Sequence, residues 1–273
     1  MNSIIIEDRY QIGESIGNGA FSSLNKVIDL EENSIKALKQ IARNNLSNEE
    51  YENLRKEYAI IHERKHPNIV IYHCEFRFKD FYCILMEYCS EGNLKNYLSK
   101  YRLLDNELIE WCRQLSSALA YLHSQNIIHR DIKPENILIQ GKSVKIADFG
   151  LSKELDHSTA VAKTLCGTCL YIAPELIFSG IYKTGYSCKI DIWSMGCVYY
   201  EMSESKLLFG NNCKNKDELF RQILSGFSIN DISENNILSE ILLKMLVKDP
   251  KDRISAKELY PSIKSLKEEN FRN

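Results

Sequence analysis

Short runs in which apolar and polar residues alternate occupy much of the first ninety positions of the chain. Gly, Asn, Asp and Ser, which favour turns, separate these runs. The pattern predicts strands at 10–17, 22–30, 34–41, 69–76 and 81–89. Strands that follow one another through short turns usually pair with antiparallel neighbours, so we expect an antiparallel sheet here.

One segment within this region has helical spacing instead. Residues 48–65 carry Leu54, Tyr58 and Ile61 three or four positions apart and end before a His–Pro pair, which predicts one helix packed on the sheet. After the turn-rich residues 90–93 the helical pattern prevails, and it predicts helices at 106–124, 190–203, 216–224 and 239–247. The change of pattern near residue 89 marks the expected boundary between a small β part and a larger helical part.

The length and the charge balance restrict the classes of function. The 273 residues suffice for one large domain or two small ones, at roughly 150 residues per domain. The 35 Lys and Arg residues nearly balance the 37 Asp and Glu residues, so we expect no direct nucleic-acid partner and only local phosphate recognition. Since the chain has no uninterrupted run of about 18 apolar residues, we expect no membrane partner either.

Nine cysteines are scattered along the chain, several of them in apolar stretches where a thiol packs as a small hydrophobic group. An odd number in such positions favours a reducing, intracellular location, cytoplasmic or nuclear. Cys166 and Cys169 have the CxxC spacing, which suits either a redox pair or two ordinary loop cysteines. The second interpretation is favoured because no βαβ pattern surrounds the pair.

Two features of the predicted sheet suit phosphate binding, and a residue of the predicted helix could support one of them, although each has an ordinary alternative. Residues 16–24, IGNGAFSSL, bring glycines close together, so that backbone N–H groups can approach an anion; such glycines are more often only a turn. Lys39 follows an apolar-flanked strand pattern and could face phosphate, and Glu57 on the predicted helix could pair with it. A lone strand lysine or a helical glutamate usually faces water.

A set of motifs farther along the chain is more specific. Residues 128–138 read IHRDIKPENIL, residues 148–150 read DFG and residues 173–175 read APE. Following a glycine-rich loop and a strand lysine, in this order, the set resembles the signature of eukaryotic-type serine/threonine protein kinases. The resemblance covers essentially the whole chain. It implies the α+β bilobal protein-kinase fold, with a small antiparallel β-sheet lobe and one helix at 1–88 and a larger, mainly α-helical lobe at 89–273.

The resemblance implies transfer of the γ-phosphate of ATP, with Mg²⁺, to Ser or Thr hydroxyls of protein substrates. Asp131 would act on the attacking hydroxyl, and Lys133 would approach the transferring phosphate. Asn136 and Asp148 would bind Mg²⁺. The residues implied for ATP binding are Ile16, Gly17, Asn18, Gly19, Leu24, Ala37, Lys39, Glu57, Met86, Glu87, Cys89 and Leu138. Within this set, Met86 resembles the residue behind the adenine slot, and the backbone of Glu87 and Cys89 would bind adenine.

Other matches concern the scaffold and the acceptor. Lys133 and Thr168 resemble the pattern of kinases that act on Ser and Thr. Asp191 resembles the aspartate that holds the HRD backbone, and Glu175 with Arg253 resembles an ion pair that braces the second lobe. The residues implied for a regulatory column of stacked side chains are Ile61, Tyr72, His129 and Phe149. The sequence departs from the family pattern at Ser22, Leu24 and Cys169, and the last of these alters the wall that would meet the residue after the acceptor.

Arg130, directly before Asp131, implies control by a negative charge on the activation segment. The candidate phosphorylation sites are Thr164 and, nearer the loop tip, Thr159. The partner would be an upstream kinase or a second copy of the chain acting in trans. The segment after DFG resembles checkpoint kinases of the calcium/calmodulin-dependent group, whereas MEYCSEGNL also suits the never-in-mitosis type. A non-catalytic module with the same fold stays open as the alternative, because fold alone does not establish activity.

Overall fold

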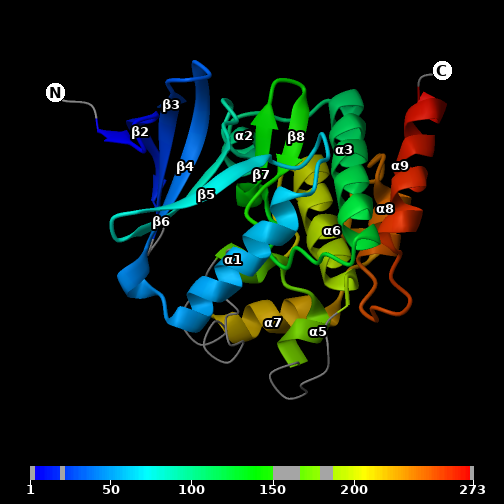
Figure 1. Ribbon diagram of the computed structural model, residues 1–273. Coiled ribbons are helices and arrows are strands. Elements are labelled where there is room, and N and C mark those ends of the chain that lie inside the picture. Colours follow the sequence, from blue (N-terminus) through cyan, green and yellow to red (C-terminus); the bar gives the residue numbers. More distant parts are fainter. Residues whose placement is uncertain (1–3, 19–21, 150–166, 179–186, 271–273) are drawn as a thin grey trace. The chain divides into compact units, whose positions relative to one another are not determined.

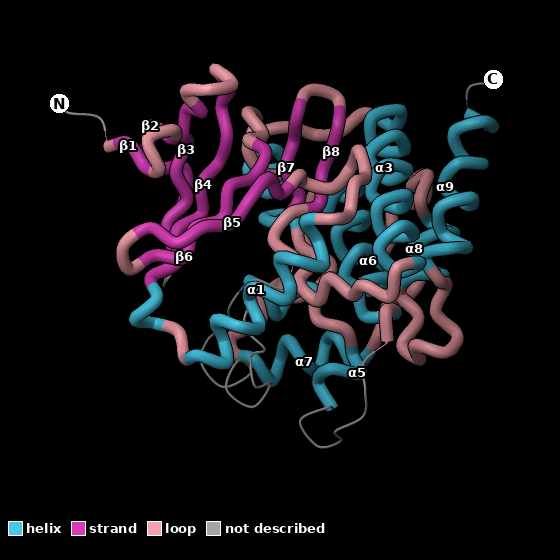
Figure 2. Tube along the Cα trace, viewed as in Figure 1, coloured by secondary structure: helices cyan, strands magenta, loops and turns pink. Residues whose placement is uncertain are grey.

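The computed structural model of the protein describes residues 4–18, 22–149, 167–178 and 187–270. The chain divides into two compact units, Met1–Ser90 and Glu91–Asn273. Strands predominate in the first unit and helices in the second (Figures 1 and 2). This α+β composition is the one expected from the change of pattern along the sequence, and each unit is described by itself below.

The first unit is built on a six-stranded antiparallel sheet with the order β1-β2-β3-β4-β6-β5. Its strands are β1 Ile5–Ile6, β2 Tyr10–Asn18, β3 Ser22–Asp29, β4 Ser34–Ala42, β5 Tyr72–Phe78 and β6 Phe81–Glu87. The five predicted strands are confirmed, although β5 begins three residues later than its apolar run. The two-residue β1 is too short to show alternation and was not predicted.

Cross-strand partners lie on the same face of a sheet, so the register assigns each side chain to a face. On one face Val27, Leu38, Cys83 and Leu85 form a buried core with residues of β1 and β2. Lys39, opposite Leu24 and Ile84, lies on the other face. The alternation of the sequence therefore separates an apolar face from a face that carries Lys39.

The helix α1, Asn48–His62, packs on the face that carries Lys39. Ser47 begins the helix with a reciprocal capping box to Glu50, which satisfies backbone N–H groups of the first turn. The rings of Tyr51 and Tyr82 meet edge to face at 5.4 Å. Since Tyr82 lies on the same face as Lys39, this contact places the start of α1 on that face. The predicted helix is confirmed, except that it ends at His62 rather than at residue 65.

A buried ion cluster holds the β2–β3–β4 meander together. Asp29, fully buried, accepts hydrogen bonds from Arg9 Nε and from Lys36 Nζ at 2.8 and 2.7 Å. Lys36 Nζ also contacts Glu32 at 2.7 Å. Hydrogen bonds from Arg9 and Lys36 hold the pKa of the Asp29 carboxyl well below its usual range. Because Lys36 is itself only 5% exposed, each charge depends on the other for compensation.

In its described residues the second unit is mainly helical, with one small hairpin. Its elements are α2 Leu94–Leu98, α3 Asp105–Ser124, β7 Ile137–Gln140, β8 Ser143–Ile146, α5 Pro174–Phe178, α6 Lys189–Glu204, α7 Lys216–Ser225, α8 Ser239–Met245 and α9 Ala256–Asn270. The four predicted helices are confirmed as α3, α6, α7 and α8 within two residues at each end. The predicted Asn106 start of α3, for example, moves to Asp105.

The core of the second unit surrounds α6. Trp193 and Tyr199 on this helix are fully buried, and Gly196 allows α8 to approach, because a Cβ atom there would lie 2.9 Å from Leu246. The long helix α3 packs against α9 and against the hairpin β7–β8. The sequence analysis missed α9, whose sixth residue is Pro261, a residue that normally breaks a helical pattern.

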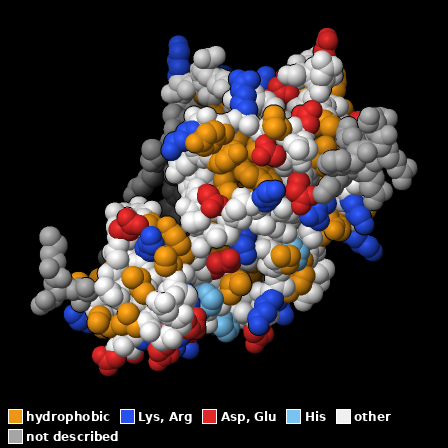
Figure 3. Space-filling model, turned by 90° about the horizontal axis from the view of Figure 1, so that it is seen from above, with side chains coloured by type: hydrophobic (Ala, Val, Ile, Leu, Met, Phe, Trp, Pro, Cys, Tyr) orange, Lys and Arg blue, Asp and Glu red, His pale blue; other side chains and the backbone are white. Residues whose placement is uncertain are grey.

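On the face drawn in Figure 3, Lys and Arg side chains are interspersed with Asp and Glu side chains. This distribution agrees with the nearly equal numbers of positive and negative residues. Among the described residues, none of the helices combines the length and the apolar character that crossing a membrane requires.

Replacing Asp29 by Asn should destabilise the first unit by about 2 to 3 kcal/mol at pH 7, because Lys36 would stay buried with part of its countercharge removed. Amide hydrogen exchange of β3 and β4 in the full chain measures this loss. The matched control is Glu31→Gln, which removes an exposed partner of Arg9 and should change exchange little.

The effect of Asp29→Asn should also depend on pH. The pKa of Asp29 is lower in the folded chain than in the unfolded chain, so its stabilisation is present above about pH 4 and is lost as the pH falls toward the folded value. The difference between wild type and variant should therefore shrink in acid. A difference of equal size at pH 7 and pH 3 would show that the charge of Asp29 contributes nothing.

Candidate active site

One carboxylate of α6 holds the loop that joins α3 to β7 through backbone hydrogen bonds. Asp191, 1% exposed, accepts hydrogen bonds from the backbone N–H groups of His129 and Arg130, both at 2.9 Å. The same carboxylate lies 2.9 Å from His123 Nε2 on α3. These contacts confirm the predicted tie between Asp191 and the HRD backbone, and they add His123, which the sequence analysis missed.

The backbone hydrogen bonds compensate for an unfavourable conformation at Arg130. This residue has φ of +69°, in the left-handed region that an arginine seldom adopts. Such a conformation costs roughly 1 to 3 kcal/mol and persists only where surrounding contacts enforce it. The two N–H bonds to Asp191 are contacts of this kind, and the left-handed turn directs the chain into Asp131.

The buried His129 connects this loop to the segment before DFG. Its Nδ1 accepts the backbone N–H of Asp131 at 3.2 Å, so Nε2 must carry the proton and donate it to the Ala147 carbonyl, 2.9 Å away. The ring also meets Phe149 edge to face at 4.7 Å. The predicted neighbours His129 and Phe149 are therefore in contact, which confirms this part of the predicted column within the second unit.

The carboxylate of Asp131 is oriented by two neighbours from its own loop. Lys133 Nζ donates to both carboxylate oxygens, at 2.9 and 2.7 Å. Asn136 Nδ2 donates to the carboxylate and to the backbone carbonyl of Asp131, both at 2.8 Å. The Asp131 side chain keeps 14% of its surface exposed, so the oriented carboxylate can still be reached by an acceptor group.

The second predicted pair of polar residues lies beside the hairpin. Asn136 precedes β7 and is 7% exposed, and its carbonyl accepts the N–H of Ala147 at 2.8 Å. Asp148 follows Ala147 and has φ of +58°, a second strained position in the same neighbourhood. Because the amide nitrogen of Asn136 is engaged by Asp131, its oxygen is the side-chain atom suited to a hard cation. Leu138, in β7, is half-buried.

Five of the predicted ATP-binding residues of the first unit lie on one face of its sheet. Register pairs Gly17 with Leu24, Leu24 with Lys39, and Ala37 with Met86. Because β4 alternates, Ala37 and Lys39 share a face, and the pairing extends that face across β2, β3, β4 and β6.

The remaining predicted positions of the first unit are partly described. The backbone N–H of Glu87 donates to the Ile71 carbonyl at 2.8 Å, so this N–H is already engaged within the first unit. Cys89 is buried, whereas Ile16 and Asn18 are exposed. Gly19 lies outside the described residues, as does the side chain of Glu57, so the pairing of Lys39 with Glu57 stays a prediction.

The predicted activation segment also stays untested. Gly150, Thr159, Thr164 and Cys166 lie outside the described residues, and the side chain of Thr168 is not described. Cys169 is described, and it is buried.

The brace predicted for the second unit is confirmed. Both terminal nitrogens of Arg253 bind Glu175, at 2.7 and 3.0 Å, and the Arg253 side chain is fully buried. Its guanidinium lies over the ring of Trp193, 5.2 Å from the centroid. Arg253 also donates to backbone carbonyls on either side, which satisfies the remaining donors of a buried cation.

A second buried carboxylate on α6 was missed at the sequence level. Glu201 accepts the hydroxyl of Tyr171 at 2.6 Å and Lys95 Nζ at 2.7 Å. Burial, followed by the charge of Glu201, raises the pKa of Tyr171, so its hydroxyl remains a donor. The only sequence signal was an acidic residue in an otherwise apolar helix, which suits a buried polar contact as well as a solvated position.

Comparison with protein families finds a match to the protein kinase domain over residues 10–262. The serine/threonine-protein kinase Nek11 of Macaca fascicularis is 35% identical over 206 residues, 72% of this chain and 32% of that protein. The inactive serine/threonine-protein kinase PLK5 of Mus musculus is 31% identical over 96% of this chain and 42% of that protein. The chain thus spans about a third to two fifths of the length of these curated relatives.

Among solved structures, the crystal structure of Rad53 1-466 in complex with AMP-PNP superposes with a TM-score of 0.76. It is 30% identical, and the match covers 93% of this chain and 65% of that one. The likeness extends over both units and confirms the expected bilobal fold.

Replacing Asp191 by Asn should destabilise the second unit by about 2 kcal/mol, because an NH₂ group would face at least one of the N–H donors of the loop and leave it unpaired. Denaturant unfolding followed by tryptophan fluorescence reports on this unit, since Trp111 and Trp193 both belong to it. The exposed Asp217→Asn, in the first turn of α7, is the control. Equal stability of the Asp191 and Asp217 variants would refute the importance of this carboxylate.

Proposed function

The chain belongs to the protein kinase domain family, and we propose that it transfers the γ-phosphoryl group of ATP to serine or threonine hydroxyls of proteins. The observation that carries this proposal is the Asp131 carboxylate, which Lys133 and Asn136 orient while part of it stays exposed. Relatives named as serine/threonine-protein kinases support the same acceptor class.

In the proposed reaction, Asp131 accepts a hydrogen bond from the acceptor hydroxyl and takes up its proton as the new oxygen–phosphorus bond forms. The bond between the γ-phosphorus and the oxygen bridging to the β-phosphate breaks, and ADP leaves with that oxygen. Lys133, which lies within 2.9 Å of both oxygens of Asp131, then places a positive charge beside the transferring phosphoryl group. Phosphoryl transfer depends on positioning and on charge neutralisation more than on covalent chemistry. Two oppositely charged groups with fixed geometry suit that requirement.

Asn136 and Asp148 are the residues that would hold Mg²⁺. The fit is favourable because both offer side-chain oxygens, and because the amide nitrogen of Asn136 already donates to Asp131. When bound, Mg²⁺ neutralises charge on the phosphate oxygens of ATP. The bonds to Asp131 orient the Asn136 side chain, and the Ala147 N–H donates to the Asn136 carbonyl, which links Asn136 to the segment that carries Asp148.

For ATP we propose the face of the first sheet that carries Ala37, Lys39 and Met86. Lys39, paired with Glu57, would neutralise the α- and β-phosphates, while Ala37 and Met86 would offer apolar surface to adenine. The other residues proposed for the nucleotide are Ile16, Gly17, Asn18, Gly19, Leu24, the backbone of Glu87 and Cys89, and Leu138. AMP-PNP in the Rad53 structure supports a nucleotide as the ligand.

We further propose control through phosphorylation of Thr164, or of Thr159, by an upstream kinase or by a second copy of this chain. The basis is Arg130, whose guanidinium precedes the catalytic carboxylate in sequence, together with the pairing of arginine with phosphate. For the cellular location we propose a reducing compartment, cytoplasmic or nuclear, because the described cysteines are all free. The physiological substrates are expected to be proteins with exposed Ser or Thr.

The proposed activity is tested by incubating the full chain with γ-labelled ATP, Mg²⁺ and a mixture of unrelated proteins, and then by identifying the labelled amino acids. Label on Ser and Thr is expected. ATP binding without transfer would instead identify a non-catalytic module, the state that the name of the inactive PLK5 relative ascribes to that protein.

Asp131→Asn should lower turnover at least 100-fold and leave the dissociation constant of ATP unchanged, because the carboxylate acts on the acceptor in the transition state. Rates come from label transfer and ATP affinity from calorimetry. Exposed Asp105→Asn, at the start of α3, is the control. Turnover retained in Asp131→Asn with unchanged ATP affinity would exclude the assigned role.

Asp148→Asn and Lys39→Met should both fail, but for different reasons. The first variant loses a metal ligand and should regain part of its activity when Mg²⁺ is raised or replaced by Mn²⁺. The second loses a positive charge that the metal does not replace, so added metal should help it less. Equal rescue of both variants would contradict the separate roles.

A further inference from the structure

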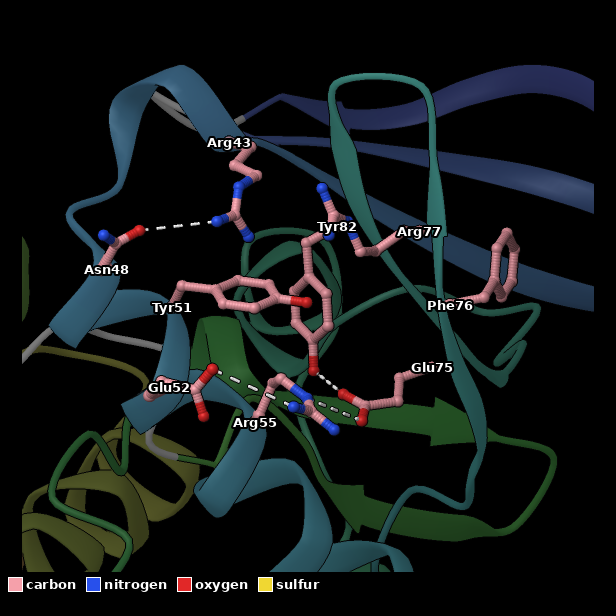
Figure 4. Close-up of a pocket in the computed structure, with 9 residues that line it drawn as sticks. All are labelled: Arg43, Asn48, Tyr51, Glu52, Arg55, Glu75, Phe76, Arg77 and Tyr82. Carbon is pink, nitrogen blue, oxygen red and sulfur yellow. Dashed lines mark hydrogen bonds and ion pairs between the residues drawn. The ribbon is translucent and has the colours of Figure 1, made fainter.

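A pocket of about 580 Å³ opens in the first unit, between the turn before α1, α1 itself and the strands β5 and β6 (Figure 4). Three arginines line it: Arg43, Arg55 and Arg77. We propose that this pocket binds the phosphorylated side chain of a serine or threonine in a protein segment. The proposal concerns the first unit alone and does not depend on the chemistry proposed for Asp131.

Side chains from β5 and β6 form the base of the pocket. Register pairs Arg77 with Tyr82 and Glu75 with Ile84, so Glu75, Arg77 and Tyr82 share one face of the sheet. Tyr51 of α1 meets the Tyr82 ring at 5.4 Å and closes the opposite side. The two rings stand at the centre of the close-up, with the guanidinium groups around them (Figure 4). Strand register and helix packing thus fix the positions of the charges.

The two carboxylates of the pocket already have partners. Arg55 Nε lies 3.5 Å from Glu75, and another nitrogen of Arg55 lies 4.0 Å from Glu52. The hydroxyl of Tyr82 donates to the second oxygen of Glu75. Burial, together with Glu75, raises the pKa of Tyr82, so this donor keeps its proton. Arg55 therefore compensates the negative charges of both Glu52 and Glu75.

Within the part of the chain that the structure describes, the other two guanidinium groups lack such partners. Among the described residues, no carboxylate lies within ion-pair distance of Arg43 or Arg77. Arg43 lies over the ring of Tyr51, 4.3 Å from its centroid, and one of its nitrogens makes a long bond of 3.5 Å to Asn48. Its other terminal nitrogen is buried and has no hydrogen-bond partner in the described chain.

A buried donor without an acceptor is destabilising, so this nitrogen of Arg43 would gain from an acceptor supplied by a ligand. In Figure 4, Arg43 and Arg77 lie on the same side of the two tyrosine rings, away from Glu52 and Glu75. A phosphate monoester brings about −1.5 to −2 charges and three acceptor oxygens. Its geometry matches the planar fork of a guanidinium, which lysine cannot reproduce.

The cavity and its position favour a phosphate carried by a protein segment. The space exceeds that of a phosphate group and is lined by aromatic rings, which suit the remainder of a peptide. The pocket adjoins β5, the last strand in the sheet order, and an edge strand offers backbone groups to an extended chain. The nearby Glu52 and Glu75 make this surface unfavourable for a membrane with many anionic headgroups.

The test measures fluorescence anisotropy of the full chain with a degenerate pool of labelled peptides, each with one phosphothreonine, at about 0.15 M salt. The matched pool has threonine at that position. We expect the phosphorylated pool to bind at least tenfold more tightly. The double variant Arg43→Gln/Arg77→Gln should remove this preference, and Arg102→Gln, an exposed arginine of the second unit, should leave it intact.

Arg43→Lys adds a sharper comparison, because it keeps the charge but not the fork and should weaken binding severalfold. Circular dichroism verifies folding; if the half-buried Arg43 variants fail to fold, Arg77→Gln alone, at an exposed position, should still weaken binding severalfold. Equal binding of the two pools, or equal loss in Arg102→Gln, would overturn the proposal. So would equal affinity for inorganic phosphate or for phosphoinositide vesicles.

Discussion

The carboxylate of Asp191 is the constraint on which the candidate active site depends. It is buried in α6 and receives two backbone N–H groups and the ring of His123, so three donors compensate one buried charge. Those bonds hold Arg130 in its left-handed conformation, and the turn delivers Asp131 to the place where Lys133 and Asn136 bind it. Each of these contacts joins near neighbours in space, and the series starts at Asp191 in the core of the second unit.

A comparable rule organises the first unit. Lys36 and Lys39 are three residues apart on β4, so alternation sends them to opposite faces of the sheet. The buried Lys36 forms ion pairs with Asp29 and Glu32, whereas Lys39 shares its face with Ala37 and Met86. The strand thus uses one lysine to stabilise the fold and keeps the other on the face proposed for the nucleotide.

Periodicity predicted the strands and the main helices because alternating or helical apolar spacing is a direct result of burial on one face. It missed β1, which is too short, and α9, which contains Pro261. The motifs around Asp131 predicted the members of the site but could not reveal the tautomer of His129 or the left-handed turn at Arg130, because those features arise from contacts with Ala147 and Asp191. The pocket of Arg43 and Arg77 was likewise invisible, since it depends on strand register and on the packing of α1.

The central claim is that Asp191 does not touch the substrate but positions Asp131, the carboxylate that accepts the proton in the proposed transfer. The most direct measurement is the single-turnover rate of phosphoryl transfer from γ-labelled ATP in Asp191→Asn, at a temperature where the variant is fully folded. The account predicts a rate at least tenfold lower than that of the wild type, with the dissociation constant of ATP changed less than twofold. A wild-type rate in the folded variant would contradict it.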